Sequence, residues 1–292
     1  MAEWVLGVIG GSGLYEIEGL QDPRWVKIDS PFGAPSDELL TGSLGPVKLV
    51  FLPRHGRGHR LPPSGLNFRA NIDALKRAGC TDVISLSAVG SLREALEPGT
   101  FVVVDQFIDR TFAREKSFFG EGLVAHVSMA EPVCPRLSAF AADAGRAAGA
   151  RIIEGGTYLC MEGPQFSTKA ESALYRSWGC DVIGMTNMPE AKLAREAELP
   201  YASIAMVTDY DCWREDFEHV QVSHILEVLH GNADLARDLV RRMAQSLPAR
   251  REPSPIDTCL DTALITAPQA RDPMAARRLD AVAGRVLGNL AK

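Results

Sequence analysis

The sequence predicts an α/β fold in which helices pack on a central, mainly parallel sheet. Short apolar runs of strand length alternate along the chain with segments whose apolar residues recur at helical spacing. Glycine, proline or polar clusters punctuate these segments. The 292 residues contain no internal repeat, low-complexity tract or long linker. One domain is therefore expected over residues 1–292, with a helical tail from about residue 255.

Each expected strand is an apolar run that stops at a turn signal. The first run is closed by a glycine cluster at residues 10–13, and the second leads into Pro53. Pro98 and Gly99 mark the turn before the fourth. Strands are expected at residues 4–9, 47–52, 82–86, 101–104, 152–160, 182–185 and from 201 to the aspartates at 209 and 211.

The expected helices are recognised by their spacing and their ends. Phe68, Ile72 and Leu75 repeat at helical spacing, and Gly79 stands where a C-cap glycine belongs. Pro189 occupies a favoured first-turn position. Helices are expected at residues 68–78, about 136–148, 169–178, 189–198 and 222–247, with a loop at 248–255, then a short element and a last helix near 274–290.

Composition excludes several classes of function. The formal net charge is -6 and no run is rich in Lys or Arg, so nucleic acid is not an expected partner. No apolar run approaches the roughly 18 residues that a membrane helix needs. The first residues lack the basic region and cleavage site of a signal peptide, which favours a cytoplasmic location.

The cysteines and histidines do not indicate a metal centre. The six cysteines are scattered, without CxxC or zinc-like spacing, and are expected to be buried free thiols. His55 and His59 have the spacing of a zinc pair on a helix, but the residues between them are Gly-Arg-Gly. These residues disfavour a helix and lack the general-base glutamate of such motifs. No metal site is expected from these residues.

Two carboxylates, Asp209 and Asp211, follow a buried strand directly. In open α/β sheets, ligands bind in the crevice outside the carboxyl ends of the strands. An acid held there by apolar surroundings can keep its proton near neutral pH, which suits general acid catalysis. We therefore expect these aspartates to face a ligand as catalytic residues.

Several groups suited to binding an anion also follow strands. Ser12 lies in a glycine-rich turn, Arg54 and His55 follow the second strand, and Ser87 and Thr186 end two others. Glycine-rich turns bind anions through backbone N–H groups, and arginine binds oxyanions in a bidentate manner. The turn could instead be structural and the arginine could lie in an exposed loop. Together the groups favour phosphate or a similar anion.

Two apolar residues lie beside these polar candidates. Met185 precedes Thr186, and Phe166 precedes Ser167. Either could be an ordinary core residue or could pack against a ligand, and the sequence leaves both readings open.

A series of ordered motifs resembles the methylthioadenosine phosphorylases of the purine nucleoside phosphorylase family. The motifs are GGSGLY, SPFGAPSD, PRHGRGH, AVGSLRE, DQFIDRT, MAEPVCP, EGPQFST, GMTNMPEAKLARE and YASIAMVTDYDCW. They extend from about Val5 to Leu247 and, more weakly, to residues 263–266. The resemblance implies a phosphorylase/hydrolase-like fold with a twisted, mixed central sheet. It also implies cleavage of 5'-methylthioadenosine by phosphate, giving adenine and 5-methylthioribose 1-phosphate.

The resemblance also implies roles for individual residues. Asp209 and Asp211 would face N7 and N6 of adenine, Met185 would pack on the ribose, and Phe166 would line the base pocket. His126 would come from a neighbouring subunit of a homotrimer. The phosphate would be held by Ser12, Arg54, His55, Ser87, Ala88 and Thr186. The methylthio pocket would be shaped by Val222, Ile225 and Leu226.

Residue types at two positions favour adenine over 6-oxopurines. A protonated aspartic acid can donate to purine N7 and accept from the exocyclic amine of adenine. Phosphorylases for 6-oxopurines usually have Asn where Asp209 stands, and Glu where Ser167 stands. The alternatives are a methylthioinosine or other 6-oxopurine phosphorylase, a nucleosidase that uses water, and a nucleotide-binding module without chemistry. 5'-Deoxyadenosine is a second expected substrate, because one heavy atom in an apolar pocket contributes only a few kcal/mol.

Overall fold

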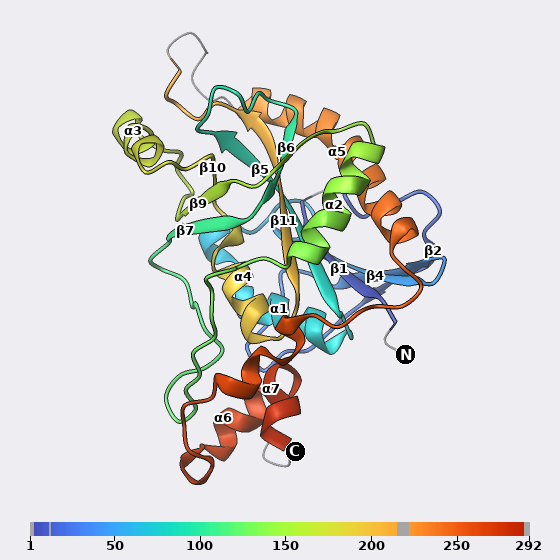
Figure 1. Cartoon of the computed structure of the whole chain (residues 1–292), viewed down its shortest axis with the longest axis vertical. Helices are drawn as coiled ribbons and strands as arrows, with labels where there is room; N and C mark the ends of the chain where they lie inside the picture. The colour runs from blue at the N-terminus through green and yellow to red at the C-terminus, as the bar shows by residue number, and fades with distance from the viewer. Residues whose placement is uncertain (1–2, 12, 215–221, 289–292) are drawn as a thin grey trace.

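The structure is a computed structural model that describes residues 3–11, 13–214 and 222–288. In this part of the chain eleven strands form one mixed sheet, as the family resemblance implied (Figure 1). The strands are β1 (Val5–Gly10), β2 (Gln21–Val26), β3 (Leu39–Leu44), β4 (Val47–Pro53), β5 (Asp82–Ser91), β6 (Thr100–Val104), β7 (Gln106–Arg110), β8 (Arg151–Glu154), β9 (Thr157–Met161), β10 (Val182–Gly184) and β11 (Tyr201–Asp209).

Strand β5 lies at the centre of the sheet. It pairs in parallel with β1 on one side and with β11 on the other, and its end also pairs antiparallel with β10. β4 continues the parallel set beyond β1, whereas β6 runs antiparallel to β11. The carboxyl ends of β4, β1, β5 and β11 therefore share one edge, where ligands bind in open α/β sheets.

Helices cover both faces of this sheet (Figure 1). Side chains alternate between the faces along each strand, so that Val8 packs with one core and Ile9 with the other. One core includes α2 (Pro135–Ala147) and α5 (Val222–Ser246), and the other includes α1 (Phe68–Arg77) and α4 (Asn187–Glu196). The tail contributes α6 (Pro273–Arg278) and α7 (Asp280–Leu287) to the second core, and α3 (Lys169–Ser177) lies beyond β9 and β10.

The predicted strands and helices occur where the apolar pattern is strong, but some boundaries differ. The single strand expected at 152–160 is two strands, because Gly155 and Gly156 adopt φ values of 82° and 148° between them. The last helix is likewise divided into α6 and α7. Three strands were missed: β2 is largely exposed and contains a proline, β3 contains Gly42, and β7 is partly exposed, so none has a strong apolar signature.

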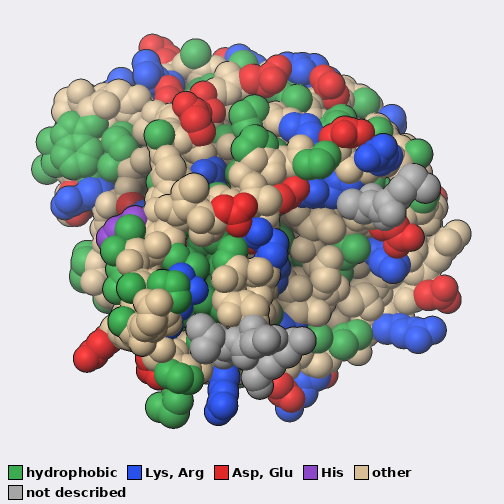
Figure 2. Space-filling view, turned by 60° about the horizontal axis from the view of Figure 1, so that its bottom comes forward, with side chains coloured by type: hydrophobic (Ala, Val, Ile, Leu, Met, Phe, Trp, Pro, Cys, Tyr) green, Lys and Arg blue, Asp and Glu red, His purple; other side chains and the backbone are tan. Residues whose placement is uncertain are grey.

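The surface agrees with the composition. On the face shown in Figure 2, acidic and basic side chains are interspersed, without an extended basic stripe. Within the described residues, no helix has both the length and the apolar character required to cross a bilayer.

Candidate active site

Asp209 and Asp211 lie at the carboxyl edge of the sheet, as the sequence predicted. Asp209 ends β11 beside Gly90 of β5, after a local shift in register. Its Oδ1 accepts a hydrogen bond of 2.8 Å from the Asp211 backbone N–H, and its Oδ2 accepts one of 2.7 Å from the Thr208 hydroxyl. A Cβ at position 90 would lie 3.0 Å from Asp209 Oδ1, so a glycine there permits the close approach.

Both carboxyl groups favour the protonated form more than an exposed aspartate does. Burial raises the pKa of Asp209 to about 6, against the opposing effect of its two hydrogen bonds. Burial also raises the pKa of Asp211, although the hydroxyls of Ser172 and Ser167 and the Cys212 N–H act in the opposite direction. An acid whose pKa lies near the working pH is suited to proton transfer.

The segment between β9 and α3 packs against this corner. Cys212 Sγ lies 3.3 Å from the Ser167 carbonyl oxygen, and Trp213 Nε1 donates to the Ser91 carbonyl at 2.8 Å. Ser167 is therefore brought next to the aspartates. The Phe166 side chain is 46% exposed, so it is available for contact and is not a core residue.

Ser87 and Thr186 form a pair of buried hydroxyls at the same edge of the sheet as the aspartates. β10 pairs antiparallel with the end of β5, with Ile183 opposite Gly90. Continuing this register places Thr186 opposite Ser87 and Met185 opposite Ala88. Both hydroxyl oxygens are buried and have no hydrogen-bond partner among the described residues. A buried polar group without a partner costs free energy unless a ligand satisfies it, which makes this pair a candidate binding site.

Met185 links the hydroxyl pair to the segment before α3. A Cβ at Gly163 would lie 2.5 Å from Met185 Sδ, so this methionine packs directly on the glycine. Its carbonyl oxygen accepts a hydrogen bond of 2.7 Å from Arg114 Nη1. Met185 is thus held between Thr186 and the segment that joins β9 to α3.

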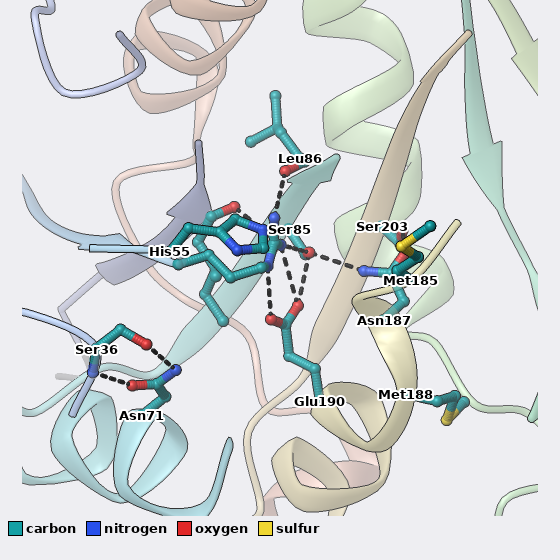
Figure 3. A network of polar contacts seen from close by, with 12 residues as sticks. Ser36, His55, Asn71, Ser85, Leu86, Met185, Asn187, Met188, Glu190 and Ser203 are labelled. Carbon is teal, nitrogen blue, oxygen red and sulfur yellow. Dashed lines mark hydrogen bonds and ion pairs between the residues drawn. The ribbon is translucent and has the colours of Figure 1, made fainter. Parts of the chain in front are cut away.

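Arg54 is buried just after β4 and forms an ion pair with Glu190. Figure 3 shows Glu190 beside Ser85 and Leu86, which also contact this arginine. Its Nε donates to Glu190 Oε2 at 3.0 Å and its Nη1 to the Leu86 carbonyl at 2.9 Å. Ser85 Oγ accepts from Arg54 Nη2 at 2.5 Å and donates to Glu190 Oε1 at 2.7 Å. Burial lowers the pKa of Arg54, but the charge and hydrogen bonds of Glu190 outweigh it and raise the pKa above its usual value.

The network around Arg54 was not predicted from the sequence. Asn187 Nδ2 donates to Ser85 Oγ at 3.0 Å and to the Tyr201 hydroxyl at 2.8 Å. The Tyr201 hydroxyl donates to Glu190 Oε1 at 2.8 Å, and the Ser203 hydroxyl donates to Asn187 Oδ1 at 2.9 Å. These residues come from β5, α4 and β11. The only sequence signal was that polar residues interrupt otherwise apolar strands.

His55 follows Arg54 and is uncharged at neutral pH. Burial, together with the charge of Arg54, lowers the pKa of His55 to about 4. Its Nδ1 lies 2.9 Å from the Leu61 carbonyl oxygen, which only accepts, so Nδ1 carries the hydrogen. Nε2 then has a lone pair. The His59 ring stacks on the His55 ring with centroids 4.3 Å apart.

Four predicted residues are not placed by the side-chain geometry. Ser12 lies outside the described residues. Val222, Ile225 and Leu226 belong to the first turns of α5, and their side chains are also outside the described part of the structure. The methylthio pocket expected from them stays a prediction.

His126 lies away from the aspartates. It is exposed, and its backbone N–H donates to the Ala263 carbonyl at 2.9 Å, in the tail. It lines a pocket of about 390 Å³ together with Val124, Lys192 and Glu196, which includes no other predicted site residue. The segment between β7 and α2 extends towards α6, at the opposite end of the molecule from the carboxyl end of β11 (Figure 1).

The described residues contain no group of three or more His, Cys, Asp or Glu side chains arranged to hold a metal ion. What the carboxyl edge does offer is a pair of protonatable carboxyls, two hydroxyls and a buried guanidinium.

Comparison with known proteins identifies the family of this chain. The model of the phosphorylase superfamily matches residues 5–245. The chain belongs to the phosphorylase superfamily. Within this superfamily it is 62% identical over 285 residues to the S-methyl-5'-thioadenosine phosphorylase of Cereibacter sphaeroides, covering 97% of this chain and 98% of that protein. It is also 62% identical over 290 residues to the protein of that name from Rhodospirillum rubrum, covering 97% of each.

Solved structures of the phosphorylase superfamily have the same fold. A methylthioadenosine phosphorylase sourced from an antarctic soil metagenomic library superposes with a TM-score of 0.91 at 45% identity, covering 97% of this chain and 99% of that one. The methylthioadenosine phosphorylase of Schistosoma mansoni in complex with adenine gives a TM-score of 0.77 at 39% identity, covering 83% and 91%.

Proposed function

We propose that the protein cleaves 5'-methylthioadenosine with inorganic phosphate, giving adenine and 5-methylthioribose 1-phosphate. A phosphate oxygen forms a bond to the anomeric carbon while the bond from that carbon to N9 of adenine breaks. The bonding electrons pass to the purine ring, and a proton delivered at N7 stabilises the departing base. Phosphate is a co-substrate, and the proposal includes no metal or organic cofactor.

The observation that carries the proposal is the pair of buried carboxyls at the end of β11. Burial raises the pKa of Asp209 to about 6, so a protonated carboxyl is accessible near neutral pH. A protonated carboxyl donates through its O–H and accepts through its carbonyl oxygen, which matches the N7 and N6 edge of adenine. Asp209 and Asp211 are assigned to this edge, with Phe166 and Ser167 beside the base.

The phosphate site is assigned to the adjacent hydroxyls and backbone. Ser87 and Thr186 supply two O–H donors, and the Ala88 backbone lies between the base and anion sites. Arg54 Nη1 uses one of its two hydrogens in the bond to the Leu86 carbonyl, and the other hydrogen is assigned to the phosphate. Neutral His55 can accept from a protonated phosphate oxygen through Nε2. Ser12 and the methylthio pocket of Val222, Ile225 and Leu226 complete the assignment, with Met185 against the ribose.

Steady-state rates with matched substrates test this function. Methylthioadenosine should be cleaved faster than methylthioinosine, and only in the presence of phosphate, with adenine and the sugar phosphate formed in equal amounts. Faster cleavage of the inosine compound would contradict the base assignment, and cleavage without phosphate would indicate a nucleosidase. 5'-Deoxyadenosine measured in parallel reports how strictly the 5' pocket requires sulfur.

The proposed assembly is a homotrimer in which His126 completes the site of a neighbouring subunit. The support is the position of His126 at the far end of its own subunit, beside the exposed apolar side chains Val124 and Ile265. His126→Ala and Asp209→Asn proteins, each weakly active, should regain activity when mixed under conditions that exchange subunits. Failure to regain activity, with mixed oligomers demonstrated, would place both residues in one subunit's site.

The domain organisation and location belong to the same proposal. The proposal treats residues 1–292 as one domain, and the ion pair between Arg285 of the tail and Glu198 supports it. A cytoplasmic location fits the six free cysteines.

A further inference from the structure

Tyr158 has a buried hydroxyl that the proposed mechanism does not use. Its side chain is 0% exposed, on β9 opposite Val182 of β10. A Cβ at Gly184 would lie 2.0 Å from the Tyr158 oxygen, so the ring lies along β10 with its hydroxyl over the glycine. Within the described residues, this hydroxyl has no hydrogen-bond partner.

The Tyr158 hydroxyl is directed towards the pair formed by Ser87 and Thr186. Both hydroxyls lie close enough to lower its pKa, against a larger increase caused by burial, although neither meets the geometry of a hydrogen bond. The charge of Arg54 also acts on it. Three buried hydroxyls from β9, β5 and the end of β10 therefore converge, and the described residues satisfy none of them.

A count of hydrogens shows what this arrangement can do. Each hydroxyl carries one hydrogen and two lone pairs. A bound phosphate presents acceptors, so Ser87 and Thr186 direct their hydrogens at the anion and their lone pairs then need a donor. Tyr158 remains protonated at neutral pH, so its O–H can be this donor.

We propose that Tyr158 is a positioning residue of the phosphate site, donating its O–H to Ser87 or Thr186 so that their hydroxyls point at the anion. This inference rests on the proposed phosphate site. The hydroxyl does not touch the reacting atoms. Its effect should therefore appear in phosphate affinity and not in the chemical step.

The test is Tyr158→Phe, which removes one oxygen and keeps the ring. Phosphate affinity is measured by the rise in melting temperature on phosphate titration and by the KM for phosphate. The dissociation constant for phosphate from the melting curves and the KM for phosphate should each increase by about 3- to 10-fold, the range for losing one neutral hydrogen bond. The KM for nucleoside and the kcat at saturating phosphate should stay unchanged. The melting temperature without phosphate should not fall, because the hydroxyl has no partner to lose among the described residues.

Ser138→Ala is the matched control. Its hydroxyl is also buried and unpartnered within the described residues, but it lies in the first turns of α2, near the start of β11. It should leave phosphate affinity unchanged. In a Ser87→Ala, Thr186→Val background, adding Tyr158→Phe should have no further effect on phosphate affinity.

Three results would overturn the inference. They are unchanged phosphate affinity in Tyr158→Phe, an equal loss in Ser138→Ala, and a lower melting temperature without phosphate that accounts for the loss of activity. If phosphate fails to stabilise even the unaltered protein, the proposed phosphate site is wrong and this inference falls with it. The first three outcomes leave the proposed function standing.

Discussion

Arg54 Nε lies 3.0 Å from Glu190 Oε2, and the two side chains are only 2% and 3% exposed. The positive charge expected to attract phosphate is therefore balanced inside the protein before any anion arrives. In the proposed site, Arg54 would offer phosphate a hydrogen bond of fixed direction more than an excess of charge. Neutral His55 points to the same conclusion.

Glu190→Gln should lower the free energy of unfolding by about 3 to 5 kcal/mol, because it leaves a buried guanidinium without its counter-charge. Urea denaturation monitored by fluorescence measures this loss. The control is Glu97→Gln, which breaks an exposed pair with Arg151 at 2.8 Å and should cost less than about 1 kcal/mol. Similar losses in the two variants would show that the buried pair has no special weight.

Arg54→Lys should raise the KM for phosphate about tenfold or more and change the KM for nucleoside less. An ammonium group keeps the charge but cannot contact Glu190, Ser85 and the Leu86 carbonyl from one planar group. Initial rates over a matrix of phosphate and nucleoside concentrations separate the two constants. An unchanged KM for phosphate would remove Arg54 from the anion site.

Asp209→Asn should lower kcat on methylthioadenosine by about 10²- to 10⁴-fold, the usual effect of removing a positioned acid. Asn keeps an oxygen that can accept from the Asp211 N–H, so the corner should keep its shape. Single-turnover rates with bound nucleoside test the chemical step directly. Activity within a fewfold of the unaltered protein would place the proton donor elsewhere, with Asp211→Asn as the next variant.

The same variant should be more stable than the parent at high pH. Because the folded-state pKa of Asp209 is raised to about 6, ionising it costs the folded state more than the unfolded state. That cost in folding free energy is absent below pH 4, grows between pH 4 and pH 6, and reaches about 3 kcal/mol above pH 6. Denaturant unfolding at pH 8 and at pH 4 should show a higher free energy of unfolding for Asp209→Asn than for the parent at pH 8 only.

For the parent, kcat/KM should fall as pH rises from 6 to 8, because the fraction of protonated Asp209 falls. A flat profile would argue against catalysis by a protonated Asp209.

Glu196→Gln should stabilise the protein above pH 7 and have little effect below pH 5. Burial raises the pKa of Glu196 to about 7, although its carboxylate accepts hydrogen bonds of 2.7 Å from the Phe118 N–H and the Ser117 hydroxyl. The folded state therefore loses stability as pH rises through about 7. Melting temperatures from pH 5 to 9 should converge at the acidic end. Parallel curves for parent and variant would contradict the raised pKa.

The sequence was sufficient for the parts of the site that follow strong strands. Asp209 is the last residue of a nine-residue strand whose first eight residues are buried, and strands of that kind end at the ligand edge in this fold class. Ser87 and Thr186 were predicted to lie at strand ends, but β5 continues to Ser91, so Ser87 lies inside the strand, and Thr186 lies two residues beyond β10. Their juxtaposition depends on the antiparallel register of β10 with β5, which the alternation of elements does not specify.

The residues that were missed depend on contacts between distant segments. Arg54 and Glu190 are 136 positions apart, and Glu190 in isolation resembles a solvated residue of a helix. Tyr158 lies in an apolar run, where a tyrosine is compatible with ordinary core packing. Only the three-dimensional structure shows that its hydroxyl ends beside two others.

The central position of β5 has a consequence for substrate size. Ser87 lies three residues before Gly90, where β5 meets Asp209, a separation of about 10 Å along an extended strand. If the proposed phosphate and base sites are correct, a single continuous backbone sets the distance between them. A nucleoside whose sugar held phosphate and base at another separation would then reach only one of the two sites at a time, so β5 would select substrates by size.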